Sequence, residues 1–230
     1  MIRRVWSELK IMGADFLILS AAFTAAIILL SAAAGELLPF YPVSFEVFFP
    51  FYAAIAVGEW GKTRADSNFD LIAAQSSSLF RWVLLRYVVP FCISTVFALF
   101  GMVFSSVFRY EFPLWELLLI YCPPAFFLSS LCALFGIHCT GEHVAASACG
   151  ILWLLLLLAR RLSAIPGAGY IYPFIRYAGV QNSVWLWNKG IVAALGLSLW
   201  GILYLRCRRT GSKNLKTAPK RNCCPLLRHR

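Results

Sequence analysis

Residues Glu59 to Arg86 read EWGKTRADSNFDLIAAQSSSLFRWVLLR, and they form the only long polar interval between two apolar runs in the first half of the chain. The interval opens with turn-forming residues, continues as a short amphipathic run at Phe69 to Ala74, and breaks at Ser76 to Ser78. Long apolar runs flank it on both sides. We therefore expect this interval to connect two membrane-spanning helices and to be the place where a soluble partner acts on them.

The composition of the chain sets its class. Hydrophobic residues make up 60% of the sequence and charged residues 13%, with a mean hydropathy of +0.74, whereas soluble domains carry about a quarter charged residues. Several runs reach the roughly 20 residues that a helix needs to cross about 30 Å of hydrocarbon. These runs lack the alternation of a membrane barrel, and the helix is the other fold that satisfies its backbone in lipid. The sequence predicts an all-α polytopic membrane protein.

Six spans follow from the apolar runs, and three further features are expected around them. Residues 1–12 mix basic and apolar residues, which predicts a short amino-terminal interfacial helix. A cleavable signal is the alternative for this region, but the apolar run is too long for one. Residues 162–189 combine prolines, glycines and aromatics, which indicates short re-entrant helices in the outer leaflet. The predicted spans are 14–34, 38–58, 82–108, 114–137, 144–159 and 187–206.

The distribution of Lys and Arg predicts the orientation. With both termini in the cytoplasm, seven basic residues between Arg3 and Arg86 and nine at or after Arg206 lie inside, against five outside. Four of those five fall between Arg160 and Lys189. The net charge of +11 is mostly one carboxyl-terminal tail, so it does not indicate nucleic-acid binding. We expect a six-span domain at 1–206 in the plasma membrane and a basic, disordered cytoplasmic tail at 207–230.

Charged residues within the spans are few. Glu46 lies near the outer end of the second span, and an interfacial position is favoured over a functional one. The sequence contains no Ser/His/Asp arrangement and no pair of carboxylates at membrane depth. The chain is therefore expected not to be an enzyme, and its spans are interpreted as free of charge.

Three motifs suggest a functional site, but for two of them we favour an ordinary structural explanation. Gly61-Lys62-Thr63 resembles the end of a phosphate-binding loop, but it follows a membrane helix instead of a strand. His138, Cys139, Glu142 and His143 could hold a metal, but their spacing matches no standard site, so a polar turn is expected. Lipid modification or redox chemistry of the tail pair Cys223-Cys224 stays open. None of the eight cysteines falls in a predicted outer loop, which indicates a reduced compartment.

The interval that follows the second span resembles the membrane subunit of a type-2 ATP-binding-cassette (ABC-2) exporter. In that family a Glu closes the second span, and a polar turn, a short coupling helix and a break then lead to a cation entering the third span. The corresponding residues here are Glu59, Gly61 to Thr63, Asn68 to Ala74, Ser76 to Ser78 with Arg81, and Arg86. The family commonly has proline where this chain has Ser76.

The resemblance implies a transporter subunit without chemistry of its own. A separate cytoplasmic ABC ATPase would bind ATP and Mg²⁺ and contact the coupling helix, so no cofactor is expected in this chain. A second membrane subunit, identical or similar, would complete the pathway in the bilayer. The sequence favours an amphipathic or hydrophobic cargo such as a peptide, a lipid-linked molecule or a drug. The residues expected to contact the ATPase are Glu59, Asn68, Phe69, Asp70, Leu71, Ile72, Ala74, Gln75 and Arg81.

Two other classes of function are considered. A membrane scaffold or assembly factor could use the same helical bundle without transporting anything. A lipid-modifying membrane enzyme is disfavoured because clustered His, Asp or Glu residues at membrane depth are missing. An ATPase that is encoded beside the chain, or that copurifies with it, would distinguish the exporter from the scaffold.

Overall fold

The computed structural model describes residues 2–34, 42–61, 79–109, 113–141, 143–165, 167–180 and 184–217, and most of these residues are helical, with no strand among them. Within these residues, six helices are long and apolar enough to cross a membrane. The predicted all-α architecture with six apolar helices of spanning length is therefore confirmed. The elements are α1 (Ile2–Ala34), η1 (Pro42–Phe48), α2 (Phe49–Trp60), α4 (Leu79–Arg109), α5 (Leu114–His138), α6 (Val144–Leu158), η2 (Ala159–Ala164), η3 (Ala168–Tyr170) and α7 (Val184–Thr217).

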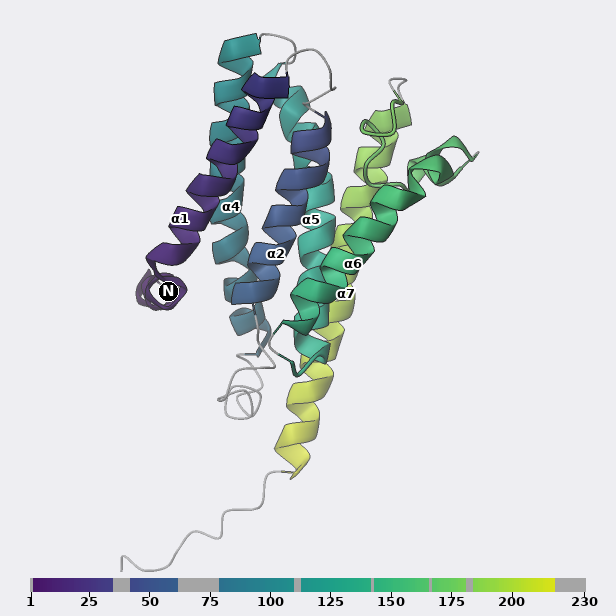
Figure 1. Ribbon diagram of the computed structural model, residues 1–230. Coiled ribbons are helices and arrows are strands. Elements are labelled where there is room, and N and C mark those ends of the chain that lie inside the picture. The colour runs from purple at the N-terminus through teal and green to yellow at the C-terminus, as the bar shows by residue number, and fades with distance from the viewer. Residues whose placement is uncertain are drawn as a thin grey trace, which may run out of the picture.

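The six long helices run alternately up and down, so that the connections gather at the two ends of the bundle (Figure 1). One end holds the end of α2, the start of α4, the turn between α5 and α6, and the end of α7. The other end holds η1, the start of α5, η2, η3 and the start of α7. We call the first the inner end and the second the outer end, following the predicted orientation.

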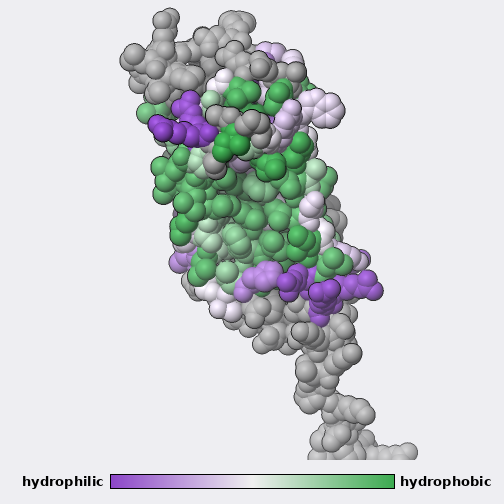
Figure 2. Space-filling view, turned by 90° about the vertical axis from the view of Figure 1, so that its right-hand side faces the viewer, coloured by the Kyte–Doolittle hydropathy of each residue, from purple (hydrophilic) through white to green (hydrophobic). Residues whose placement is uncertain are grey.

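Helices α2 and α5 form the centre of the bundle. Helix α2 packs against α4, α5 and α6, while α5 also contacts α4, α6 and α7. Buried residues make up 67% of the α2 span and 61% of the α5 span, against 17% of the α6 span. Figure 2 shows a broad apolar belt between hydrophilic residues at both ends, as a bilayer requires. Motion of α2 would therefore reach most of the molecule.

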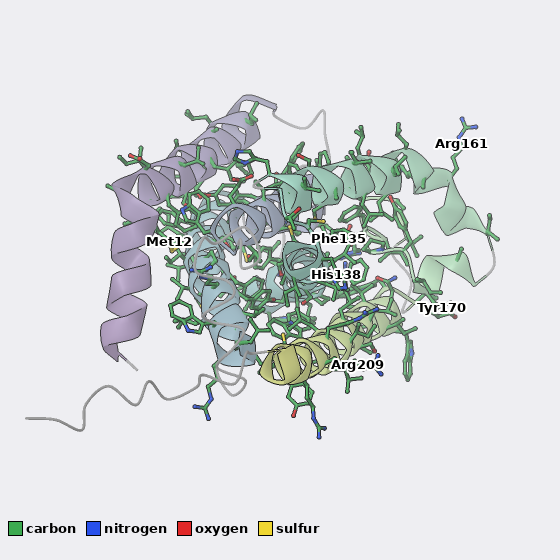
Figure 3. The ribbon with its side chains drawn as sticks, turned by 90° about the horizontal axis from the view of Figure 1, so that it is seen from below. Met12, Phe135, His138, Arg161, Tyr170 and Arg209 are labelled. Carbon is green, nitrogen blue, oxygen red and sulfur yellow. The ribbon has the colours of Figure 1, made fainter. Side chains whose placement is uncertain are left out.

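Helix α1 contains a sharp kink at Gly13. This residue has φ 72° and ψ 175°, a backbone conformation that is strained for any residue with a Cβ. The part of α1 before the kink turns sideways from the rest of the helix (Figures 1 and 3). The kink thus separates the predicted amino-terminal helix from the first span, and its position at the membrane interface remains a prediction.

Several boundaries differ from those predicted. Helix α5 extends from Leu114 to His138 with Pro123 and Pro124 inside it. Helix α7 begins at Val184 and continues to Thr217, so that it covers the first part of the predicted tail. Residues 218–230, including Cys223 and Cys224, lie outside the described residues. Between α6 and α7 the chain forms the short 3-10 helices η2 and η3, whose re-entrant nature remains a prediction.

Two glycines of α7 provide a test of the α5–α7 packing. A Cβ at Gly196 would lie 2.6 Å from Cδ1 of Phe126 and 3.5 Å from Cα of Phe127, whereas a Cβ at Gly201 meets no described atom within 4 Å. Gly196→Ala should lower the free energy of unfolding by about 1–3 kcal/mol through overpacking. The matched variant Gly201→Ala should leave it unchanged or raise it by up to about 1 kcal/mol. Unfolding of the purified protein by dodecyl sulfate titration measures both, and equal effects would contradict this packing.

Candidate functional sites at the two ends of the bundle

Glu59 stands at the end of α2 and joins it to α6 at the inner end. Its two carboxylate oxygens lie 3.1 and 3.0 Å from Nδ1 of His143, the residue that precedes α6. Both side chains reach solvent, since His143 is 69% exposed and Glu59 26% exposed. The contact is a surface hydrogen bond, and it becomes an ion pair when the imidazole is protonated.

The ends of the polar interval lie side by side. A Cβ at Gly61 would be 3.7 Å from the carbonyl oxygen of Arg86, and Val57, Leu79 and Val83 belong to one buried cluster. Gly61 closes α2 by donating its N–H to the carbonyl of Val57 at 2.7 Å. The interval therefore leaves and re-enters the bundle at adjacent points.

Of the residues expected to contact a partner, the structure describes Glu59 and Arg81. Arg81 is exposed in the first turn of α4. Nothing in the structure tests the predicted coupling role of the remaining residues, because residues 62–78 lie outside those that it describes. These remaining residues are Asn68, Phe69, Asp70, Leu71, Ile72, Ala74 and Gln75.

The polar turn between α5 and α6 contains no described metal cluster. Among the residues that the structure describes, no three His, Cys, Asp or Glu side chains are placed to hold an ion. Nδ1 of His138 lies 2.9 Å from the carbonyl of Leu134, one turn back in its own helix, while His143 contacts Glu59. The two imidazoles therefore have separate partners, and Glu142 lies outside the described residues.

Three helices meet closely beside Glu59. A Cβ at Gly58 in α2 would lie 2.7 Å from Sγ of Cys132 in α5 and 3.1 Å from Cα of Ala146 in α6. We expect Gly58→Ala to lower the free energy of unfolding by about 1–3 kcal/mol. In a Cys132→Ala background the loss should shrink but not vanish, because the backbone of Ala146 remains in place.

Gly150→Ala in α6 is the matched control for this junction. The nearest described atom to its Cβ would be Cε2 of Phe51, at an ordinary contact distance of 3.9 Å. We expect little change in the free energy of unfolding. Dodecyl sulfate titration of the four variants completes the comparison, and strict additivity of Gly58→Ala and Cys132→Ala would show that the thiol does not limit the space at Gly58.

Glu46 is fully buried within the protein at the outer end, and its interfacial depth in the bilayer remains a prediction. Its carboxylate pairs with the ammonium of Lys189, which is also buried. The same carboxylate accepts the backbone N–H groups of Arg176 at 3.2 Å and Tyr177 at 2.5 Å. Nζ of Lys189 also donates to the carbonyl of Pro173 at 3.1 Å. The expectation of uncharged spans is wrong, because both charges of this pair lie in helices of spanning length.

A second ion pair and a buried amide extend this contact. The guanidinium of Arg176 pairs with Glu116 in the first turn of α5 and lies 4.9 Å from the ring centre of Trp185. Nδ2 of Asn188 lies 2.8–3.0 Å from the carbonyl oxygens of Gly169, Tyr170 and Tyr172, which share its two N–H donors. We call this set the outer polar network; it consists of Glu46, Glu116, Arg176, Asn188 and Lys189.

The outer polar network holds the segment between η3 and α7 against the bundle. Two carboxylates face two cations, so the four charges balance. Tyr172 in this segment is buried and donates its hydroxyl to the carbonyl of Leu156 at 3.0 Å. Burial and, secondarily, the nearby charge of Glu46 raise the pKa of Tyr172, which keeps this donor protonated. The network thereby joins η1, α5, α7 and residues 169–177.

Sequence reasoning missed this network, although part of its signal was present. Glu46 and Lys189 each fall inside a predicted span near its outer end, and an ionisable residue at membrane depth requires a partner. Two opposite charges at the same end could therefore have been paired. Glu116 carried the same signal, since it lies near the outer end of the predicted span 114–137, but Arg176 did not, because it lies in an irregular stretch.

Comparisons of the chain with protein-family models, with curated proteins and with solved structures return no match.

Proposed function

We propose that the chain is the membrane subunit of an ABC-2-like exporter that moves an amphipathic or hydrophobic cargo outward. The observation that carries this proposal is the interval Glu59 to Arg86, whose order of features resembles that family and whose two ends lie together beside the central helix α2. The six apolar helices of spanning length agree with the membrane domain that the resemblance implies.

In this proposal the polar interval receives mechanical work from a cytoplasmic ABC ATPase. ATP and Mg²⁺ belong to that partner, and this chain contributes no catalytic group. A displacement of the interval would act on α2 through Gly61 and on α4 through Leu79. From α2 it would pass to α5 by packing and to α6 through the Gly58 junction and the Glu59–His143 contact. Packed helices that shift between two arrangements are an established way to transmit such motion.

The remaining parts of the assembly follow from the same proposal. Two membrane subunits, identical or similar, enclose the pathway, and each binds one ATPase. The protein resides in the plasma membrane with both termini in the cytoplasm. Peptides, lipid-linked molecules and hydrophobic drugs are the cargo classes compatible with the apolar spans.

Copurification tests this proposal. The tagged full-length chain is expressed with the ATPase encoded beside it, purified in detergent, and analysed for composition and ATP hydrolysis. We expect a stable complex that contains both proteins in equal numbers and hydrolyses ATP. A chain that purifies alone in monodisperse form would contradict the exporter and favour the membrane scaffold.

A further inference from the structure

Residues 159–165 and 167–171 form an excursion from the outer end of the bundle, which we call the outer flap. It contains η2 and η3 and follows directly on α6. In Figure 1 this segment extends sideways beyond the other helices, and in Figure 3 the labelled side chains of Arg161 and Tyr170 lie at the periphery. The outer polar network holds its carboxyl-terminal side through the carbonyls of Gly169 and Tyr170.

The outer flap combines exposed cations with exposed apolar side chains. Arg160 and Arg161 are exposed, and the guanidinium of Arg160 lies 4.9 Å from the ring centre of Tyr177. Ile165 is 51% exposed, Tyr170 42% and Ile171 60%. Such a pairing of basic and apolar groups is typical of elements that lie in the headgroup region of a membrane.

The position of the arginines along α6 indicates their depth. The face of α6 formed by Ile151, Leu154, Leu155 and Leu158 is exposed, as expected for contact with lipid chains. The apolar span ends at Arg161. Arg160 and Arg161 follow the exposed Leu158 at the end of this span, so in a bilayer they would lie at the level where phosphate groups begin.

The charge of this half of the chain is one-sided. No Asp or Glu occurs after Glu142. At the outer end, Glu46 pairs with Lys189 and Glu116 with Arg176, so these two carboxylates and two cations neutralise each other. Arg160 and Arg161 are the other two of the four cations between Arg160 and Lys189, and the sequence of the flap holds these two cations and no Asp or Glu.

We propose that the outer flap binds the phosphate headgroups of anionic lipids in the leaflet at the outer end. Arg160 and Arg161 supply guanidinium donors, which suit phosphate oxygens in bidentate geometry. Ile165, Tyr170 and Ile171 insert at the boundary between headgroups and chains. The binding offsets the cost of placing cations on the side that the distribution of Lys and Arg disfavours. It depends on the membrane domain alone and not on the proposed exporter activity.

Site-directed photocrosslinking of lipids tests the proposal. The full-length chain with Tyr170→benzoylphenylalanine is reconstituted in vesicles of equimolar phosphatidylcholine and phosphatidylglycerol, and the crosslinked lipids are counted by mass spectrometry. We expect phosphatidylglycerol to exceed phosphatidylcholine by at least about five-fold, since a single cation near an anionic surface already contributes a preference of about that size. Arg160→Gln with Arg161→Gln should bring the ratio to about one.

Matched variants separate a local site from general charge. Arg208→Gln with Arg209→Gln removes two exposed cations at the inner end of α7, and the ratio at position 170 should not change. Arg161→Gln alone should give a ratio between those of the unmodified flap and the double variant. This single variant tests the proposal if the double variant fails to fold. Crosslinking at the bulk ratio in the unmodified flap, or an equal loss in both double variants, would overturn the proposal.

Discussion

Lys189→Met is expected to lower the free energy of unfolding by about 3–5 kcal/mol, because it leaves the carboxylate of Glu46 buried without its cation. The side chain of Glu46 is 0% exposed and that of Lys189 is 3% exposed. Met preserves most of the volume of Lys, so the loss measures the charge and not a cavity. Unfolding of the detergent-purified protein by dodecyl sulfate titration gives the difference.

Two further variants assign the loss to the buried pair. Arg209→Met removes an exposed cation from the same helix and should change the free energy of unfolding by less than about 0.5 kcal/mol. Glu46→Gln combined with Lys189→Met should recover part of the stability, because no isolated charge remains in the interior. If Lys189→Met lowers the free energy of unfolding no more than Arg209→Met does, then Glu46 has access to water and the outer polar network does not stabilise the fold as a buried ion pair.

The spans could be predicted because their cause is local. A run of apolar residues that must satisfy its own backbone in hydrocarbon forms a helix whatever its neighbours are. Hydropathy therefore located all six helices of spanning length, with start positions a few residues from those observed. It did not predict where α7 ends, because polar residues beyond the bilayer can continue a helix, as they do here from Cys207 to Thr217.

The outer polar network was missed because its contacts are distant in sequence. Glu46 and Lys189 are separated by 143 positions, and Glu116 and Arg176 by 60. Hydropathy gives the cost of a charge inside a span but does not identify the residue that compensates it. Because the partner of Glu46 could not be identified from the sequence, an interfacial position was predicted, where an unpaired charge has the lowest free-energy cost. Residues 171–180 were expected near lipid, yet Tyr172, Phe174 and Ile175 are buried.

The inner end was predicted in outline for a different reason. Glu59 and Gly61 lie where a helix must end, and the turn-forming residues after them mark that end in any context. The contact between Glu59 and His143 joins residues 84 positions apart and had no sequence signal. In the proposed function this contact would transmit motion, because it links the end of α2, next to the polar interval, to α6.

Asp70→Ala combined with Leu71→Ala is expected to reduce the copurified ATPase about ten-fold or more. A few anchoring residues usually provide most of the affinity of an interface, and the loss of two such anchors removes on the order of 2 kcal/mol or more. Leu71 would insert as an apolar anchor, while Asp70 would make a polar contact. ATP hydrolysis measured per membrane subunit should fall in proportion, whereas the free energy of unfolding of the isolated chain should stay constant.

Glu111→Ala combined with Leu114→Ala provides the matched control, since it removes the same two kinds of side chain from the sequence between the third and fourth predicted spans, on the predicted outer side. This variant should retain the ATPase in full. If the wild-type chain binds the ATPase and the Asp70 and Leu71 variant binds it equally well, the ATPase contacts another part of the inner end. The exposed residues Arg81 and His143 would then be the next candidates. If both variants lose the ATPase equally, the loss reflects weakened folding, and the polar interval has no special role in assembly.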